Sequence, residues 1–232
     1  MIDAVLIFGG SGDIGKDICK TFLKEGYKVF ASYNTSKPNI KDENIIFFHY
    51  DTRSMNDFFE IFSYDIYNVI GIFFCIGVAS KKNSIIDTQI DEFLMLNEIN
   101  AISFIKIVQE LYSIIERCES KVIVFNSEAI FKNNKNSAPY SASKSYLHSI
   151  VLSLNNELVD KGFKIKEIFL PPVSSRMMRK VARKKGYTDF EEYIDKVLKG
   201  RILNTDEIAL ACKKYIMGDE VALDVLLQEY LQ

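Results

Sequence analysis

The sequence predicts an α/β fold in which helices cover both faces of a doubly wound parallel sheet of six to seven strands. Short apolar runs, rich in β-branched and aromatic residues, alternate with longer amphipathic segments along the 232 residues. This alternation is typical of buried parallel strands joined by right-handed helical crossovers. The chain is 48% hydrophobic with only 4 prolines, and no repeat or low-complexity linker interrupts it. One large core is therefore expected.

Six short runs are predicted to be strands because each is brief, apolar and rich in residues that favour a pleated, buried backbone. In chain order they are Ala4–Phe8, Lys28–Ser32, Ile45–His49, Val69–Cys75, Lys121–Asn126 and Lys164–Leu170.

Two of the intervening segments carry clear helix boundaries. Asp13–Glu25 is followed by Gly26, a plausible C-terminal cap, and Pro139–Lys161 begins with proline in its first turn and is followed by Gly162. The second helix has an apolar face at helical spacing. Its members are Leu147, Ile150, Val151, Leu154 and Leu158.

The segment at about 174–201 differs from the rest because it is helical in pattern, strongly charged and inserted between the last convincing strands. It is predicted to be a substrate lid on a single domain that spans residues 1–232. A pair of solvated surface helices is the alternative, and the sequence favours neither.

Composition excludes several classes of function. The net charge of −2 and the pI near 5.8 argue against nucleic-acid binding, which usually needs a basic face. The four cysteines are widely spaced, so neither a metal cluster nor a disulfide framework is expected. No apolar run is long enough to suggest a membrane span or a signal peptide. A cytoplasmic protein is predicted.

A glycine-rich segment, Gly9-Gly10-Ser11-Gly12-Asp13-Ile14-Gly15, follows the first strand and begins the first helix. Three spacings fit it: Gly10/Gly12/Gly15, Gly9/Gly12/Gly15, and Gly9/Gly15 with Asp13 inside. In each, glycine allows a tight turn and close backbone approach to a diphosphate at the helix N-terminus. This context predicts a Rossmann-type dinucleotide site at Gly9, Ser11, Gly12, Asp13, Ile14 and Gly15.

The second strand ends at about Ser32, and the stretch from Ser32 to Lys37 contains no acid, where an NAD site would hold the ribose diol with Asp or Glu. The candidate contacts for a 2′-phosphate are Ser32, Asn34, Ser36 and Lys37. NADP(H) is therefore favoured over NAD(H). Asp51, after the third strand, can accept a hydrogen bond from the adenine amino group, and a turn-forming aspartate is the alternative.

A second group of polar residues is placed to handle a proton. Tyr140 and Lys144 are four residues apart on a predicted helix, and so share a face, where a lysine ammonium favours the phenolate. Ser127, just beyond the fifth strand, can donate to developing charge on a carbonyl oxygen. His49 and His148 lack the partners of a Ser-His-Asp arrangement and are expected to be core or surface histidines.

With these motifs in order, nearly the whole chain resembles the short-chain dehydrogenase/reductase family in its single-domain form, in outline the 3-oxoacyl thioester reductase branch. The resemblance implies that Tyr140 is the acid/base and Ser127 the stabiliser of the substrate oxygen. It also implies that Lys144 anchors the nicotinamide ribose and that Asn100, in Glu-Ile-Asn-Ala-Ile-Ser, supports a proton-relay water. Further cofactor contacts are expected at Thr52, Cys75, Gly77, Pro171 and Val173.

The chain departs from the family pattern at three places. Phe74-Cys75-Ile76-Gly77 replaces the usual Asn-Asn-Ala-Gly, and Pro172 and Arg176 replace a glycine and a threonine near the nicotinamide. The C-terminal region lacks the usual glycine-rich tail, so an altered last strand or oligomer contact is expected.

Together these features predict an NADP(H)-dependent oxidoreductase that acts on a small-molecule carbonyl or secondary alcohol. The alternative is a catalytically decayed NADP-binding sensor of the same fold. The resemblance implies a homodimer or homotetramer formed through two long helices, about Glu98–Arg117 and Pro139–Lys161. An acyl thioester, a sugar ketone and a secondary metabolite all remain open as substrates.

Overall fold

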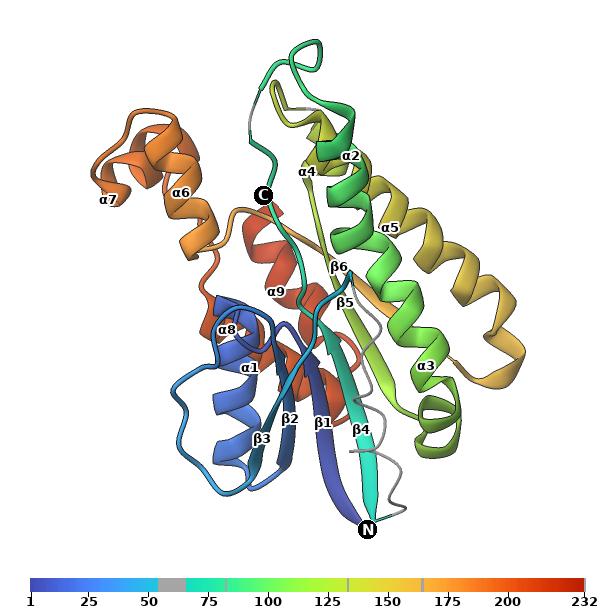
Figure 1. The fold of residues 1–232 in the computed structure, drawn as a ribbon. Coiled ribbons are helices and arrows are strands. Elements are labelled where there is room, and N and C mark those ends of the chain that lie inside the picture. The colour runs from blue at the N-terminus through green and yellow to red at the C-terminus, as the bar shows by residue number, and fades with distance from the viewer. Residues whose placement is uncertain (54–65, 82, 133, 164, 232) are drawn as a thin grey trace.

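The protein contains one parallel sheet of six strands (Figure 1), as seen in a computed structural model that describes residues 1–53, 66–81, 83–132, 134–163 and 165–231. The strand order is β3-β2-β1-β4-β5-β6. The strands are β1 (Ile2–Phe8), β2 (Lys28–Tyr33), β3 (Ile45–His49), β4 (Tyr67–Phe74), β5 (Lys121–Ser127) and β6 (Ile165–Leu170). Lys164, predicted to begin the last strand, lies outside the described residues.

Helices cover both faces of this sheet, which confirms the predicted class (Figure 1). On one face lie α2 (Ile90–Asn97), the π-helix η2 (Glu98–Ile102), α3 (Ser103–Cys118), α5 (Ala138–Glu157) and the 3-10 turn η3 (Val159–Lys161). On the other face lie α1 (Asp13–Lys24), α8 (Thr205–Ile216) and α9 (Ala222–Leu231). Strand side chains alternate between the two apolar clusters, as the period of two in a strand requires.

The predicted apolar face of α5 packs on the sheet. Leu147, Ile150 and Val151 are buried, while Leu154 and Leu158 pack against the same cluster at its edge. The second long helix differs from its predicted form. It is interrupted at Glu98–Ile102 by a π-helical turn before α3 continues to Cys118. Such a turn often marks a functional position, because it displaces the backbone locally.

Only six strands are present in the described part of the chain, and its C-terminal region forms a helix. α9 packs Leu223 against the cluster shared with α1 and α8. The predicted range of six to seven strands therefore resolves to six.

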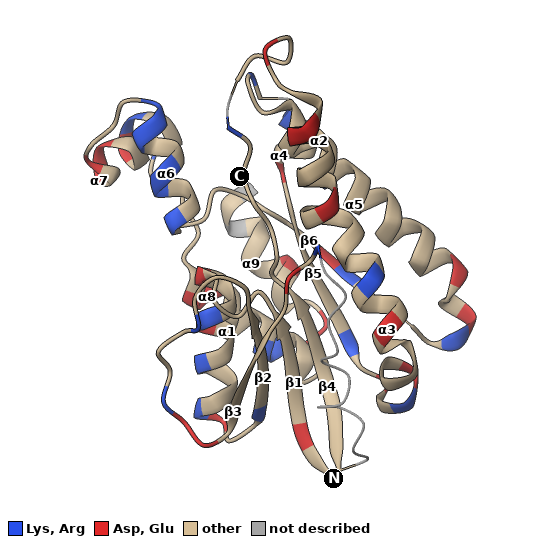
Figure 2. Cartoon of the chain, viewed as in Figure 1, with Lys and Arg blue, Asp and Glu red and all other residues tan. Residues whose placement is uncertain are grey.

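The segment after β6 folds into a small helical unit that projects from the sheet edge (Figure 1). It consists of α6 (Arg176–Lys184), α7 (Phe190–Tyr193) and the π-helix η4 (Ile194–Leu198), packed around an apolar cluster of its own. The unit begins and ends beside a bridge between Val173 and Leu203. In Figure 2, Lys and Arg positions, in blue, lie along α6, and acidic positions, in red, lie on α7.

Candidate active site

The loop between β1 and α1 is shaped by its glycines. Gly9 has a φ of +89°, and a Cβ there would lie 2.9 Å from the carbonyl carbon of Cys75. A Cβ at Gly15 would lie 2.3 Å from the carbonyl oxygen of Gly9. Gly12 is less constrained, since its Cβ would lie 3.2 Å from that same oxygen. A Cβ at Gly10 would lie 2.7 Å from Ala31 Cβ, so the loop geometry demands glycine at Gly9, Gly10 and Gly15 more strictly than at Gly12.

This loop lies at the point where the strand order reverses, between β1 and β4. α1 begins directly after it, and its N-cap residue, Gly12, provides no side-chain hydrogen bond to the helix. Because glycine has no side chain, the first backbone N–H groups of α1 have no N-cap side chain to accept their hydrogen bonds. The helix dipole favours an anion at this position. The residues present thus fit a dinucleotide diphosphate, which binds at such a reversal in related folds.

The residues predicted to contact a 2′-phosphate fall into two groups. Asn34, Ser36 and Lys37 are exposed after β2, with the Lys37 ammonium 5.7 Å from the centre of the Phe47 ring. Ser32 is buried, and its Oγ accepts a hydrogen bond from Gly9 N at 2.8 Å. Ser32 therefore supports the glycine loop from beneath, and its predicted contact with a 2′-phosphate stays a prediction.

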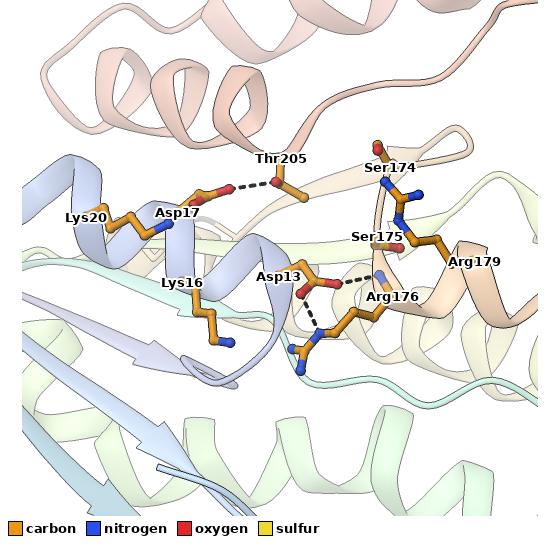
Figure 3. A pocket seen from close by; sticks show the side chains of 9 residues that line it. All are labelled: Asp13, Lys16, Asp17, Lys20, Ser174, Ser175, Arg176, Arg179 and Thr205. Atoms are coloured by element: carbon orange, nitrogen blue, oxygen red, sulfur yellow. Dashed lines mark hydrogen bonds and ion pairs between the residues drawn. The ribbon is translucent and has the colours of Figure 1, made fainter. Parts of the chain in front are cut away.

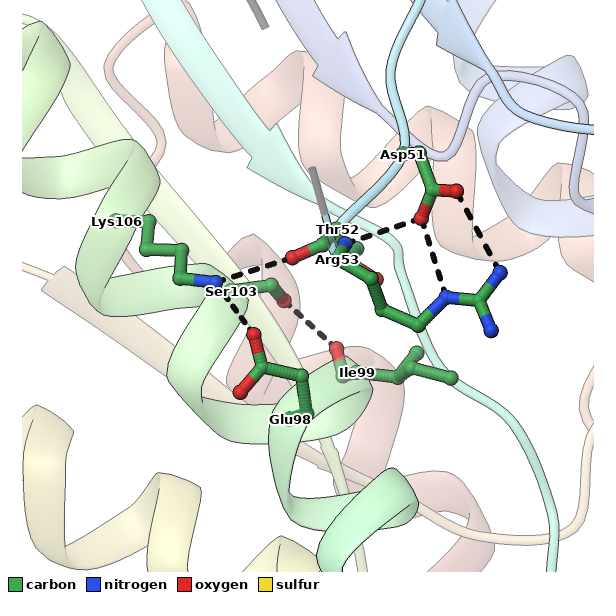
Figure 4. Close-up of polar contacts among 7 residues, drawn as sticks. All are labelled: Asp51, Thr52, Arg53, Glu98, Ile99, Ser103 and Lys106. Atoms are coloured by element: carbon green, nitrogen blue, oxygen red, sulfur yellow. Dashed lines mark hydrogen bonds and ion pairs between the residues drawn. The ribbon is translucent and has the colours of Figure 1, made fainter. Parts of the chain in front are cut away.

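Polar contacts also hold the chain after β3 (Figure 4). Arg53 N donates to the Asp51 carboxylate at 3.0 Å, and this bond, together with the Arg53 side chain, lowers the pKa of Asp51. The Lys106 ammonium of α3 donates to the Thr52 carbonyl oxygen at 3.2 Å and also pairs with Glu98. The lowered pKa keeps the Asp51 carboxylate ionised. It can therefore accept a hydrogen bond of the kind that an adenine amino group donates.

Arg176, which stands where a threonine was expected, ties the segment after β6 to the glycine loop (Figure 3). Its Nε and backbone N each donate to the Asp13 carboxylate at 2.6 Å, and its guanidinium donates to the Ser11 carbonyl oxygen at 2.7 Å. These groups border a pocket of about 300 Å³ between α1 and the start of α6. The Arg176 guanidinium therefore compensates the negative charge of the Asp13 carboxylate, which lies next to the proposed diphosphate site.

We predict that Arg176→Gln raises the Kd for NADPH about three- to tenfold, because Asp13 is then left uncompensated beside an anion. Fluorescence titration measures this change. Arg179→Gln is the matched control, since the Arg179 guanidinium lies 4.1 Å from the centre of the Phe190 ring. Equal affinities of Arg176→Gln and the wild type would contradict the prediction.

Ser127 and Tyr140 meet at the carboxyl end of β5. Ala129 N donates to Ser127 Oγ at 3.2 Å, so the Ser127 hydroxyl proton is available to another acceptor. Burial raises the pKa of Tyr140, and a hydrogen bond from the Ser127 side chain lowers it to a smaller extent. The phenol is therefore protonated at neutral pH and can act as a proton donor.

Lys144, one turn further along α5, is buried, and its ammonium donates to the Phe125 carbonyl oxygen at 2.9 Å. Burial lowers the pKa of Lys144 to about 8, against the opposing charge of Glu167. The sequence predicted that Lys144 lowers the pKa of Tyr140. In this structure the pKa of Tyr140 is raised, because desolvation of the phenol outweighs the other influences on it.

Asn100 lies on the π-helical turn and is fully buried. Its amide group donates to the Val78 carbonyl oxygen at 3.0 Å and to Ser143 Oγ at 2.9 Å, and its Oδ1 accepts from Val78 N at 2.8 Å. A Cβ on Gly77 would lie 3.7 Å from the Lys144 ammonium and 3.8 Å from Asn100 Oδ1. Asn100 thus holds the loop after β4 next to Lys144, with both amide protons in use.

The remaining predicted cofactor residues lie at the same sheet edge. Cys75 and Gly77 are half-buried in the loop after β4, and burial raises the pKa of the Cys75 thiol. Pro171 and Val173 are buried after β6, where Val173 pairs with Leu203. Parallel strands present their carboxyl ends along one edge, so these loops lie near the glycine loop.

Sequence reasoning missed three polar residues beneath this site. Asn126, His148 and Glu167 form hydrogen bonds with one another and with the backbone of the catalytic elements. Two signals were present. Glu167 interrupts an apolar strand, and His148 continues the four-residue spacing of Tyr140 and Lys144 along α5.

Within the described residues, no group of three or more His, Cys, Asp or Glu side chains could hold a metal ion. None of the described helices combines the length and the apolar character needed to cross a lipid bilayer.

Comparison with known proteins gives consistent matches. A family model described as short chain dehydrogenase matches residues 3–186. An uncharacterized oxidoreductase of Schizosaccharomyces pombe is 26% identical, with 68% of each chain covered. A short chain dehydrogenase family protein from Francisella tularensis superposes with a TM-score of 0.80 at 21% identity, covering 96% of this chain and 93% of that one. A tyrosine-to-phenylalanine variant of ElxO with NADPH bound superposes with a TM-score of 0.77 at 16% identity, covering 93% and 91%.

Proposed function

The chain belongs to the short-chain dehydrogenase family, and we propose that it is an NADP(H)-dependent enzyme that interconverts a carbonyl and a secondary alcohol. The observation that carries this proposal is the hydrogen-bonded pair of Ser127 and a protonated Tyr140. The pair lies at the edge of the sheet where the glycine loop forms a diphosphate site.

The proposed roles combine the local geometry with what membership of the family implies. The nicotinamide supplies the hydride when it is bound. Tyr140 transfers its phenolic proton to the substrate oxygen, while Ser127 donates a hydrogen bond to the same oxygen as charge develops. The buried Lys144 ammonium is positioned to hold ribose hydroxyls. Asn100 fixes the adjoining loop, and any water it supports must be held by its acceptor atoms, because both amide protons are taken.

A steady-state assay tests this function. NADPH absorbance should fall in the presence of at least one member of a carbonyl panel containing acyl thioesters, sugar ketones and small aromatic ketones. The alternative, a sensor that binds NADP without turnover, has support from Phe74–Gly77 and from the Arg176–Asp13 pair, where the chain departs from the family pattern. Tight NADPH binding with no turnover on any member would favour the sensor.

We predict that NADPH binds about tenfold tighter than NADH, because the stretch directly after β2 offers exposed Asn34, Ser36 and Lys37 and has no acid as far as Lys37. Lys37→Glu should narrow or reverse this preference by placing a negative charge near the 2′-phosphate. Lys41→Glu, an exposed lysine further along the loop, serves as the matched control. Tighter binding of NADH to the wild type would overturn the preference.

Other features belong to the same proposal. The helical unit at about 174–201, which has its own apolar cluster and is joined to the sheet beside the bridge between Val173 and Leu203, suits the role of a substrate lid on a single domain. Assembly as a homodimer or homotetramer, a cytoplasmic location, and membership of the 3-oxoacyl thioester reductase branch stay predictions of the sequence.

A further inference from the structure

Glu167 is an acid with a buried side chain in the middle of β6, an edge strand of the sheet. It lies in β6 with Ile165 and Ile168 buried on either side, and its own side chain is 8% exposed. Burying a carboxylate is costly unless its oxygens are paired. Here one oxygen lies 2.6 Å from His148 Nδ1, and the other accepts from Asn126 Nδ2 at 2.5 Å.

The register of the sheet brings Glu167 and Asn126 together. Val124 of β5 is paired with Glu167 of β6, and Asn126, two residues further along β5, points to the same face as Val124. Asn126 and Glu167 are therefore diagonal neighbours, close enough for their side chains to interact.

Asn126 connects Glu167 to both catalytic elements. Its Nδ2 also donates to the Lys144 carbonyl oxygen at 3.0 Å, and its Oδ1 accepts from Ser127 N at 2.8 Å. The backbone partners fix the orientation of this amide, because Ser127 N can only donate and the Lys144 carbonyl can only accept. One side chain thus joins the end of β5, the Lys144 turn of α5, and the acid of β6.

The second partner of Glu167 belongs to the catalytic face of α5. Tyr140, Lys144 and His148 recur every four residues and so form one stripe along that helix. The titratable groups that act on Lys144 are Glu167 from β6 and Cys75 after β4. Because the pKa values of Cys75 and Tyr140 are both raised, neither loses its proton in the range in which Lys144 does.

We propose that Glu167 is a positioning residue of this active site, which acts through Asn126 and His148 to fix Ser127 relative to the Lys144 turn and supplies a buried negative charge for the Lys144 ammonium. The expected effect of Glu167 on turnover rests on the proposed function. Its effect on cofactor binding is independent of any substrate.

Glu167→Gln tests the charge, because glutamine keeps the shape of the side chain. Glu167 raises the pKa of Lys144 against the effect of burial, so removing its charge lowers that pKa. Wild-type affinity for NADPH should weaken as pH rises through about 8, where Lys144 loses the proton it needs to bind ribose. In Glu167→Gln the weakening should begin about one pH unit lower. Fluorescence titration with NADPH between pH 6.5 and about 10 measures both curves.

Lys166→Gln is the matched control, since its ammonium lies on the neighbouring position of the same strand and pairs with Asp224. It should leave the pH dependence unchanged. A folded Glu167→Gln variant with the wild-type pH dependence of NADPH binding would overturn the proposal.

If Glu167→Gln does not fold, Glu167→Asp tests the positioning role of Glu167 instead. The shorter carboxylate keeps its charge but cannot reach both Asn126 and His148, so the proposal expects kcat to fall about tenfold with the pH dependence of NADPH binding preserved. Wild-type kcat in Glu167→Asp would contradict the positioning role. Loss of the proposed function itself would appear differently, as no turnover by the wild type.

Discussion

Replacing Tyr140 with Phe is expected to lower turnover by about 100- to 10,000-fold, the range that a positioned general acid contributes. The change removes the phenolic proton and the hydrogen bond with Ser127, while the ring still fills the same half-buried place. The Kd for NADPH should stay within a few fold, because the glycine loop and Lys144 are untouched.

Steady-state kinetics with NADPH and a carbonyl found in the panel, together with fluorescence titration, provide the measurement. Tyr146→Phe is the matched control, since Tyr146 lies on the same helix and is 43% exposed. It should retain wild-type turnover. If Tyr140→Phe kept most of its activity, Tyr140 could not be the proton donor.

Replacing Gly15 with Ala is expected to weaken NADPH binding about 100-fold. The added Cβ would lie 2.3 Å from the Gly9 carbonyl oxygen and 2.9 Å from the Gly10 Cα. Both are backbone atoms, which cannot move aside as a flexible side chain can. The loop must therefore shift, and the first N–H groups of α1 then no longer point at the diphosphate.

Gly12→Ala provides a graded comparison, because its Cβ would meet the Gly9 carbonyl oxygen at 3.2 Å, a contact that a small adjustment relieves. Its Kd for NADPH should rise less than tenfold. Circular dichroism and thermal unfolding show whether each variant is folded. A folded Gly15→Ala variant with wild-type NADPH affinity would contradict the proposed diphosphate site.

Much of the fold could be predicted from local pattern. β3 spans Ile45–His49 as predicted, and β1 differs only in starting at Ile2, where pairing with Tyr67 of β4 extends it. The π-helical turn at Glu98–Ile102 could not be predicted. Its residues have an ordinary helical pattern, and the ties of Asn100 reach Val78 and Ser143, far away in sequence.

The site was predicted in part. Ser127 and Tyr140 are brought together, and Asn100 and Lys144 both lie beside Gly77. Two further features of the site depend on the tertiary structure. Ser32 is drawn inward by the Gly9 N–H, and the pKa of Tyr140 is set by burial more than by any neighbouring charge. Neither burial nor a loop contact of this kind is encoded in the spacing of residues.

By itself, the sequence determined the alternation of strands and helices and the order of the glycine loop, Ser127, Tyr140 and Lys144, because hydrophobic period and local spacing act over a few residues. Only the tertiary structure decided that Arg176 pairs with Asp13 and that Glu167 and Asn126 support the catalytic elements. These contacts join segments distant in the chain, and they depend on strand register and helix packing, which no local pattern specifies.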